Sequence, residues 1–223
     1  MDRVFVSIDT STYWMHATGG GGEDYDSVIF RDHSGFPALK GRHVRGLLRE
    51  AARRLESWGH VPQDWDPGKM GSLTKWLFGK RGDRLAPPGI LDFPTVFHMP
   101  EPVLSLGEEY APLFSTGIAS TRIEYETGSA KDQSLRNMEA AVPGLLGGWI
   151  GFDPPDRLAL AHEEEREELQ KTIDEARKIW VDFLQQAALE VRAIGGKRTR
   201  GFGRCLMQIG DQMTQTAIEG ETA

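Results

Sequence analysis

The sequence GGKRTRGFGR, residues 195–204, combines four glycines with four cationic side chains and contains no acid. Glycine allows positive φ and close approach of the backbone to a ligand, and successive N–H groups in such turns form concave anion-binding sites. We therefore predict a phosphate-binding loop. The alternative is a helix-capping glycine followed by a solvated basic turn. The stretch has neither the ending of a P-loop nor the glycine spacing of a dinucleotide-binding turn.

The segments before this loop predict an α+β domain. Alternating β-branched residues indicate strands, and apolar residues from Val44 to Leu55 recur at helical spacing, which indicates one buried helix face. No aromatic pair on a strand is available for base stacking. The expected elements are a strand at 4–8, a helix from Gly41, a short helix at 72–79, strands at 90–93 and 149–152, a long helix from about Glu163, and a closing strand at 205–209.

Composition and charge describe a globular protein with an uneven charge distribution. The chain has 223 residues, of which 39% are hydrophobic, and a net charge of −7. Residues 40–54 carry six cations and one acid, whereas residues 162–176 carry seven acids and two cations. Because binding follows the local field, the net charge does not exclude a nucleic-acid partner. The single cysteine excludes an internal disulfide, and the absence of a long apolar run argues against a signal peptide or membrane span.

Several segments together resemble the RAMP superfamily, the RNA-binding proteins of CRISPR effector complexes. The resemblance implies a modified ferredoxin-like antiparallel sheet of the RNA-recognition type, with an inserted hairpin called the thumb. We expect a single RAMP domain at 1–209, a thumb-like insertion at about 116–148, and a disordered tail at 210–223. The segments that carry the resemblance are the first strand with the glycines at 19–22, residues 26–41, residues 77–93, residues 121–144 and the loop at 195–204.

In this family the N-terminal end of the basic helix contacts guide-RNA phosphates, and that end is Arg42-His43-Val44-Arg45 here. Arginines one helical turn apart would track an RNA backbone, although such a helix edge is often only solvated. The expected RNA-binding residues are His16, Lys40, Arg42, His43, Arg45, Arg49, Arg122, Lys131, Arg136, Lys197, Arg198, Arg200, Phe202 and Arg204.

The insertion is expected to separate stacked bases, which needs an apolar tip with cationic flanks. Leu135 and Met138, beside Lys131 and Arg136, fit that description. A plain surface hairpin is the alternative.

The resemblance also implies a catalytic residue. In backbone subunits of type III complexes, an aspartate at the place of Asp26 is required for cutting target RNA. Glu23, Asp24 and Asp32 compete for this role, and a solvated acidic loop is the alternative for all four. We expect Asp26 to hold a divalent metal, Mg²⁺ or Mn²⁺, and no organic cofactor.

The favoured function is a repeated backbone subunit of a type III CRISPR ribonucleoprotein in the prokaryotic cytoplasm, which binds guide RNA and cuts the bound target. Its expected partners are guide RNA, target RNA, copies of itself in a head-to-tail filament, the large polymerase-like subunit and a small subunit, with no membrane. The alternative is a non-catalytic RAMP subunit that caps the filament or holds one end of the guide. A third hypothesis is a metal-independent ribonuclease with His16 or His43 as general base.

Overall fold

The computed structural model describes residues 2–22, 24–79, 89–154 and 163–210. Among these residues no helix is both long and apolar enough to cross a membrane. The tail expected to be disordered at 210–223 lies outside the described residues except for Gly210, which is the last residue of a strand, so that prediction is wrong at this residue. The elements are β1 (Asp2–Thr10), β2 (Leu39–Lys40), α1 (Gly41–Ser57), α2 (Pro67–Met70), α3 (Leu73–Phe78), β3 (Leu91–Asp92), β4 (Val96–Phe97), α4 (Glu101–Leu104), η1 (Glu108–Phe114), β5 (Ser115–Ser120), β6 (Arg136–Ala141), β7 (Gly144–Phe152), α5 (Glu163–Leu189), η2 (Arg198–Arg200) and β8 (Cys205–Gly210).

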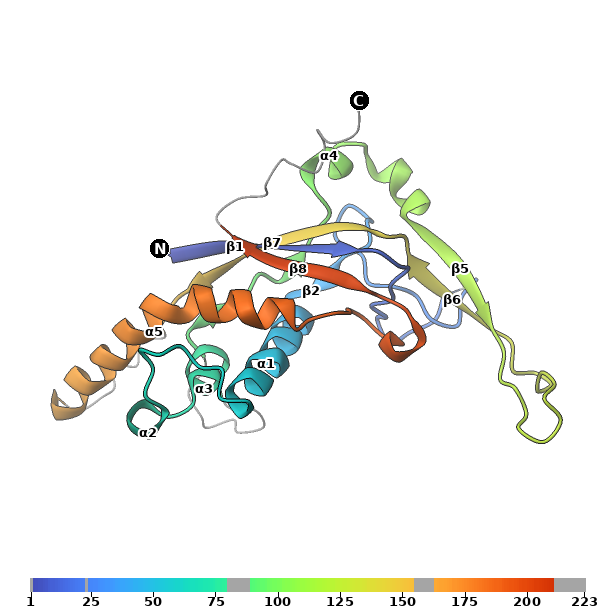
Figure 1. The fold of residues 1–223 in the computed structure, drawn as a ribbon. Coiled ribbons are helices and arrows are strands. Elements are labelled where there is room, and N and C mark those ends of the chain that lie inside the picture. The colour runs from blue at the N-terminus through green and yellow to red at the C-terminus, as the bar shows by residue number, and fades with distance from the viewer. Residues whose placement is uncertain (1, 23, 80–88, 155–162, 211–223) are drawn as a thin grey trace, which may run out of the picture.

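A four-stranded antiparallel sheet forms the centre of the molecule, in the order β3-β7-β1-β8. Alternate residues of β1 are buried, and Val6 lies between Gly148 of β7 and Ile209 of β8. The predicted α+β class with an antiparallel sheet is thus confirmed. The first and last chain segments pair as neighbours, which places the residues after α5 beside the start of the chain (Figure 1).

Helices α1 and α5 lie on one side of this sheet and pack against each other (Figure 1). The predicted apolar face of α1 is buried, since Val44, Leu48, Ala51 and Ala52 are fully inaccessible to solvent. Trp180 and Phe183 of α5 belong to the same core cluster. Burial of this shared face fixes how the basic side of α1 is oriented.

The opposite side of the sheet carries an aromatic pair, so the prediction that no such pair exists is wrong. Phe5 of β1 and Trp149 of β7 are direct cross-strand neighbours, with ring centroids 5.3 Å apart, and Trp149 is 47% exposed. These residues are far apart in the sequence, and only the strand register brings them together.

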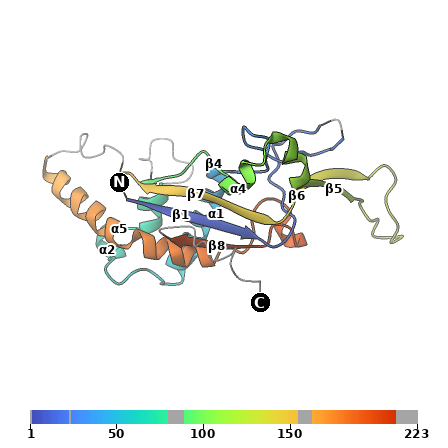
Figure 2. The ribbon, with the colours of Figure 1, turned by 90° about the horizontal axis from the view of Figure 1, so that it is seen from above.

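Strands β5 and β6 form a two-stranded hairpin that projects from the end of the molecule opposite the start of α5 (Figure 2). We call this hairpin and its connecting residues 121–135 the arm. The segment at 121–135 forms the loop at the tip, with the strands on either side. Residues 121–135 of the tip are almost all exposed.

Candidate nucleic-acid interface

The start of α1 and the glycine-rich loop meet, although they are 152 residues apart in the sequence. The Gly195 N–H donates a hydrogen bond of 2.9 Å to Nε2 of His43. The ring must be neutral at Nε2 to accept this bond. Burial and the neighbouring Arg198 both lower the pKa of His43, which favours the neutral form. Two segments that the sequence marked separately as basic therefore form one site.

A cleft of about 560 Å³ opens between these segments, and we call it the basic cleft. Four arginines line it, together with His43 and the acids Glu50 and Glu190. Two of the arginines, Arg54 and Arg192, were not among the predicted contacts. The basic run at 40–54 could have indicated Arg54 as a contact, since Arg54 is its last residue. Its Nη2 donates a hydrogen bond of 3.2 Å to the Glu190 carbonyl. The arginines are Arg42, Arg54, Arg192 and Arg198.

Two glycines of the loop allow its backbone to pack closely against neighbouring backbone. A Cβ at Gly195 would lie 2.3 Å from the Met15 carbonyl oxygen, and one at Gly203 would lie 2.0 Å from the Ile194 oxygen. Both glycines have positive φ, which side chains rarely adopt. The N–H groups of the four glycines do not face an anion, because all four donate within the protein: Gly195 to His43 and the others to the carbonyls of Met15, Arg198 and Tyr13. The prediction of backbone anion binding is therefore wrong for these glycines.

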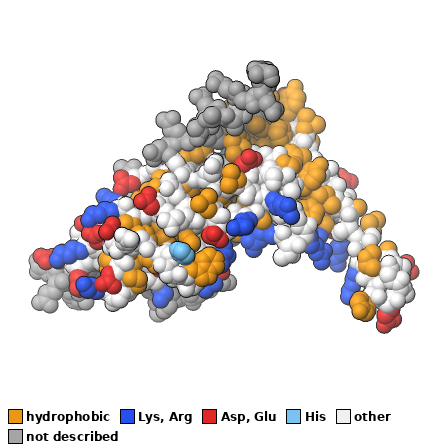
Figure 3. All heavy atoms as spheres, in the orientation of Figure 1, with side chains coloured by type: hydrophobic (Ala, Val, Ile, Leu, Met, Phe, Trp, Pro, Cys, Tyr) orange, Lys and Arg blue, Asp and Glu red, His pale blue; other side chains and the backbone are white. Residues whose placement is uncertain are grey.

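A second group of cations joins the loop to the base of the arm. Lys197 contacts the Met138 sulfur, and its pKa is lowered by burial and by the nearby charges of Arg200 and Arg136. Lys197 is therefore close enough to Arg200 and Arg136 for their positive charges to act on it. Lys and Arg side chains gather along the concave edge between the body and the arm (Figure 3). The predicted contacts in the loop and in β6 therefore lie side by side.

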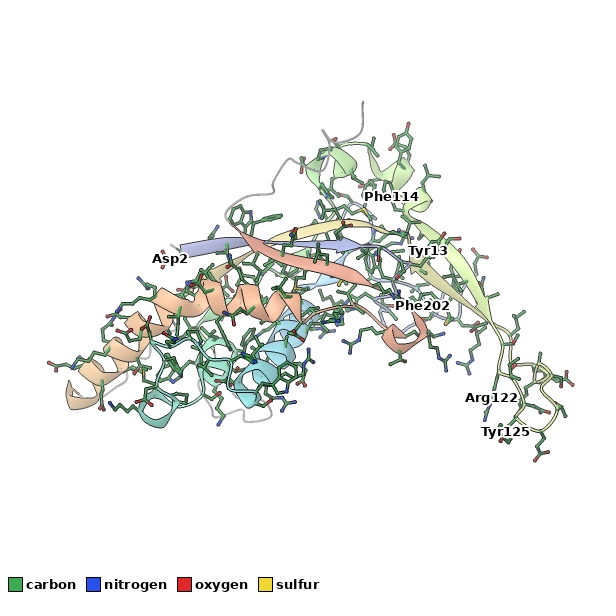
Figure 4. The ribbon with its side chains drawn as sticks, in the orientation of Figure 1. Asp2, Tyr13, Phe114, Arg122, Tyr125 and Phe202 are labelled. Atoms are coloured by element: carbon green, nitrogen blue, oxygen red, sulfur yellow. The ribbon has the colours of Figure 1, made fainter. Side chains whose placement is uncertain are left out.

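The two remaining loop residues have different environments. Phe202 is partly buried and packs with Met15, Met138 and Ala140, beneath the base of the arm (Figure 4). Arg204 is exposed at the start of β8, and its backbone pairs with Ala193. Phe202 thus supports the loop, while the Arg204 side chain faces solvent.

The arginines of α1 do not form one continuous stripe. The Arg45 Nη2 donates to the Phe78 carbonyl at 2.6 Å, and Arg53 forms a bidentate pair with Glu50. Arg49 is half-buried, and Arg42 is exposed at the first turn. The exposed guanidinium of Arg42 therefore lies at the N-terminal end of α1, beside the loop.

His16 and Lys40 lie next to this end of α1. The His16 ring is 4.7 Å from that of His43, and its Nε2 is buried with no hydrogen-bond partner. Burial, followed by the charges of His43, Lys40 and Arg42, lowers the pKa of His16 to about 4. A histidine of such low pKa is a weak general base, and Nε2 of His43 is already occupied. The geometry therefore gives little support to a histidine-based ribonuclease.

The acidic candidates differ in environment. The Asp26 carboxylate is exposed, and its Oδ2 accepts a 2.8 Å hydrogen bond from the Asn137 N–H in β6. Asp24 is also exposed. The Asp32 side chain is 1% exposed, accepts from the N–H groups of Ser34 and Phe36, and pairs with His98 at 3.2 Å. Asp32 is therefore a structural residue of a turn, and Glu23 lies outside the described residues.

A carboxylate such as that of Asp26 is a ligand type that hard divalent cations prefer, but few other protein ligands lie near it. No group of three His, Cys, Asp or Glu side chains that would hold a metal occurs in the described part of the chain. Mg²⁺ is usually held by one or two carboxylates together with water and substrate phosphate. An exposed carboxylate at the base of the arm fits that pattern only when RNA supplies the remaining ligands.

The tip of the arm has a different apolar set from the predicted one. Leu135 is exposed as expected, whereas Met138 is 8% exposed and belongs to a buried cluster, so its assignment to the tip is wrong. Ile123 and Tyr125 are exposed there instead, and sequence reasoning missed both. Arg122 and Tyr125 lie at the far end of the arm (Figure 4). Arg122 and Lys131, both exposed, provide cations next to these apolar side chains.

Comparisons with known proteins agree with this architecture. No curated protein sequence matches the chain. One similar solved chain comes from the cryo-EM structure of the type III-B Cmr-beta bound to cognate target RNA, with a TM-score of 0.65 and 10% identity over 94% of this chain and 97% of that one. A chain of the Cmr-beta apo state has a TM-score of 0.62 and 10% identity over 93% of this chain and 96% of that one. A chain of a type IV-B CRISPR complex has a TM-score of 0.52 and 15% identity over 99% of this chain and 94% of that one. At these identities the likeness concerns the fold. The RAMP superfamily model matches residues 8–206, and the chain therefore belongs to the RAMP superfamily.

Proposed function

We propose that this RAMP protein is a guide-RNA-binding backbone subunit of a type III CRISPR ribonucleoprotein complex in the prokaryotic cytoplasm. The observation that carries the proposal is the basic cleft, in which α1 and the glycine-rich loop converge. Phosphate groups of single-stranded RNA are the anions that match a row of arginines with few acids. The similar solved chains, which belong to CRISPR complexes, support the same class of assembly.

In this proposal the guide runs through the basic cleft and continues along Lys197, Arg200 and Arg136 to the arm. Copies of the subunit stack head to tail along the guide, because a heterologous interface generates an open array. The exposed apolar side chains at the tip separate stacked bases of the guide–target duplex. The large polymerase-like subunit and a small subunit complete the complex.

The binding part of the proposal predicts a salt-dependent affinity for RNA of any sequence. Replacing Arg42, Arg198 and Arg200 with alanine removes three phosphate contacts, so the slope of log affinity against log salt should become shallower by about 2. Filter binding or fluorescence anisotropy over a salt series measures this slope. Lys75→Ala, Lys171→Ala and Lys178→Ala remove the same charge outside the cleft and serve as the control. Equal slopes for both triple variants would contradict the phosphate-binding assignment.

We further propose that Asp26 is the residue on which target cutting depends. A divalent cation bound there would stabilise the charge that develops on the scissile phosphate. The Asn137 N–H holds Oδ2 of Asp26 in place, and the neighbouring arm would present a distorted nucleotide to this carboxylate. Asp26 is thereby hydrogen-bonded to β6, the strand that begins at Arg136.

Asp26→Asn keeps the shape of the side chain and removes its charge. We expect at least about 100-fold slower Mg²⁺-dependent cutting by the assembled complex, with RNA affinity unchanged. A gel assay on labelled target RNA measures the rate, and Asp24→Asn is the matched control in the same loop. If the Asp24 variant cuts slowly and the Asp26 variant cuts at the wild-type rate, the catalytic residue is Asp24 and not Asp26.

The alternative function is a non-catalytic RAMP subunit that caps the filament or holds one end of the guide. It needs no carboxylate at the place of Asp26, whose hydrogen bond with the Asn137 N–H would then serve only to hold the loop against β6. Wild-type cutting by the Asp24, Asp26 and Asp32 variants alike would establish this alternative over the catalytic one.

A further inference from the structure

A second cavity, of about 530 Å³, lies beside the first turn of α1. Arg42 lines both this cavity and the basic cleft, so the two are neighbours across one side chain. We call it the aromatic pocket. The lining residues that matter here are Phe30, Lys40, Arg42, Arg45, Phe93 and Thr95.

The frame of the aromatic pocket is fixed by close backbone packing. The Gly41 N–H donates to the Thr95 carbonyl at 2.8 Å, and a Cβ at Gly41 would lie 1.6 Å from the Pro94 carbonyl oxygen. Strands β2 and β4 pair next to this contact. A pocket whose walls are held in this way is preformed, so a ligand loses little free energy in ordering it.

Two aromatic rings and three cations surround the cavity. The Lys40 Nζ lies 4.6 Å from the centroid of the Phe30 ring, and the Arg45 guanidinium carbon lies 6.0 Å from that of Phe93. Arg45 is also held by its bond to the Phe78 carbonyl. Both rings are only partly buried. The single acid among the lining residues is Asp92.

This combination selects a class of ligand. An inorganic anion would use the cations but not the aromatic walls, and an apolar ligand would use the walls but cover the cations without pairing with them. A planar, aromatic group attached to a phosphate uses both, because bases stack on aromatic and guanidinium planes while the phosphate pairs with a cation. The volume lies within the range of small-molecule sites.

We propose that the aromatic pocket receives the base of one nucleotide of the bound RNA while Arg42 holds a phosphate next to it. This inference rests on the proposed function and adds to it a base-binding subsite. Where the RNA leaves the basic cleft, one of its bases rotates past Arg42 and stacks on the aromatic rings of the pocket.

The test compares two probes: a short adenosine RNA homopolymer and the matching ribose-phosphate oligomer that lacks bases. Phe93→Ala should weaken binding of the RNA by about 5- to 150-fold, which corresponds to the loss of one stacked base, and leave binding of the abasic oligomer unchanged. Phe93→Leu keeps the apolar volume against Phe78 and should show most of the same loss. Phe93→Trp should retain the wild-type affinity. Thermal unfolding of each variant checks that the fold is intact.

Two results separate this inference from the proposed function. Equal RNA affinity for the wild type and a folded Phe93→Leu variant would overturn the aromatic pocket as a base site and leave phosphate binding in place. Failure of the wild type to bind either oligomer would overturn the proposed function together with the subsite that depends on it.

Discussion

The basic cleft and the arm contain most of the predicted RNA contacts, but they are built differently. The cleft is held by contacts between segments far apart in the sequence, such as those of Gly195 with His43 and with Met15. The tip of the arm is held by local hydrogen bonds, such as that of Arg122 with Ser134, and Tyr125 is fully exposed. The comparison indicates that changes in the cleft affect folding and binding together, whereas changes at the tip affect function alone.

The largest effect is expected at Gly195. Gly195→Ala places a methyl group 2.3 Å from the Met15 carbonyl oxygen at a residue with a φ of +72°. Strain and clash should lower the free energy of unfolding by about 4 kcal/mol or more, which is enough to unfold a marginally stable domain. Gly196→Ala is the matched control, since its Cβ would be 3.7 Å from the same oxygen. Urea unfolding of both variants measures the difference, and equal stability would show that the loop can relax.

The elements that depend on local pattern could be predicted from the sequence. Alternation in β1 and helical spacing in α1 were sufficient, because each element has one buried face. The basic nature of the cleft could also be predicted, since its cations cluster in two segments. The contacts between distant segments could not, so the bond that joins Arg45 to Phe78 and the Phe5–Trp149 pair emerge only from the structure.

Met138 was wrongly placed at the tip, and Asp32 was one of the competing catalytic candidates. Both lie in segments that read as surface loops or hairpins, yet each contacts a side chain from elsewhere in the chain. Lys197 of the glycine-rich loop contacts Met138, and His98, the residue after β4, pairs with Asp32. A pattern of residue types indicates which side of an element is apolar, but not which surface segment another part of the chain will cover.

Unlike the exposed tip, the base of the arm contains a buried carboxylate, which gives the second prediction. Glu139 is 6% exposed and accepts from Arg31, Ser115 and the Ile29 N–H. Glu139→Gln leaves the Arg31 charge without its partner, so we expect about 2–3 kcal/mol of lost stability. Glu126→Gln at the exposed tip should change stability by less than about 0.5 kcal/mol. Chemical denaturation measures both, and similar losses would contradict the division between base and tip.

The smallest expected effect concerns the neighbouring histidines His16 and His43. Burial and nearby cations lower the pKa of His16 to about 4 from its ordinary value of 6.5, and the pKa of His43 is lowered as well. Between these two pKa values the unfolded chain binds more protons than the folded protein, so acid favours unfolding. The stability is fully present above pH 6.5 and is lost as the pH falls toward 4. Because His16 is only half-buried, solvent screening should limit its share to about 1–2 kcal/mol.

Other groups also titrate in acid, so the assignment to His16 requires a difference measurement. His16→Gln replaces the imidazole with a side chain that does not titrate, and its unfolding free energy should fall less steeply than that of the wild type between pH 6.5 and 4. His60→Gln alters an exposed histidine and should follow the wild-type curve. Parallel curves for the wild type and the His16 variant would mean that His16 gains its proton without loss of stability. The surroundings of His16 would then tolerate a charge that its burial and its neighbouring cations argue against.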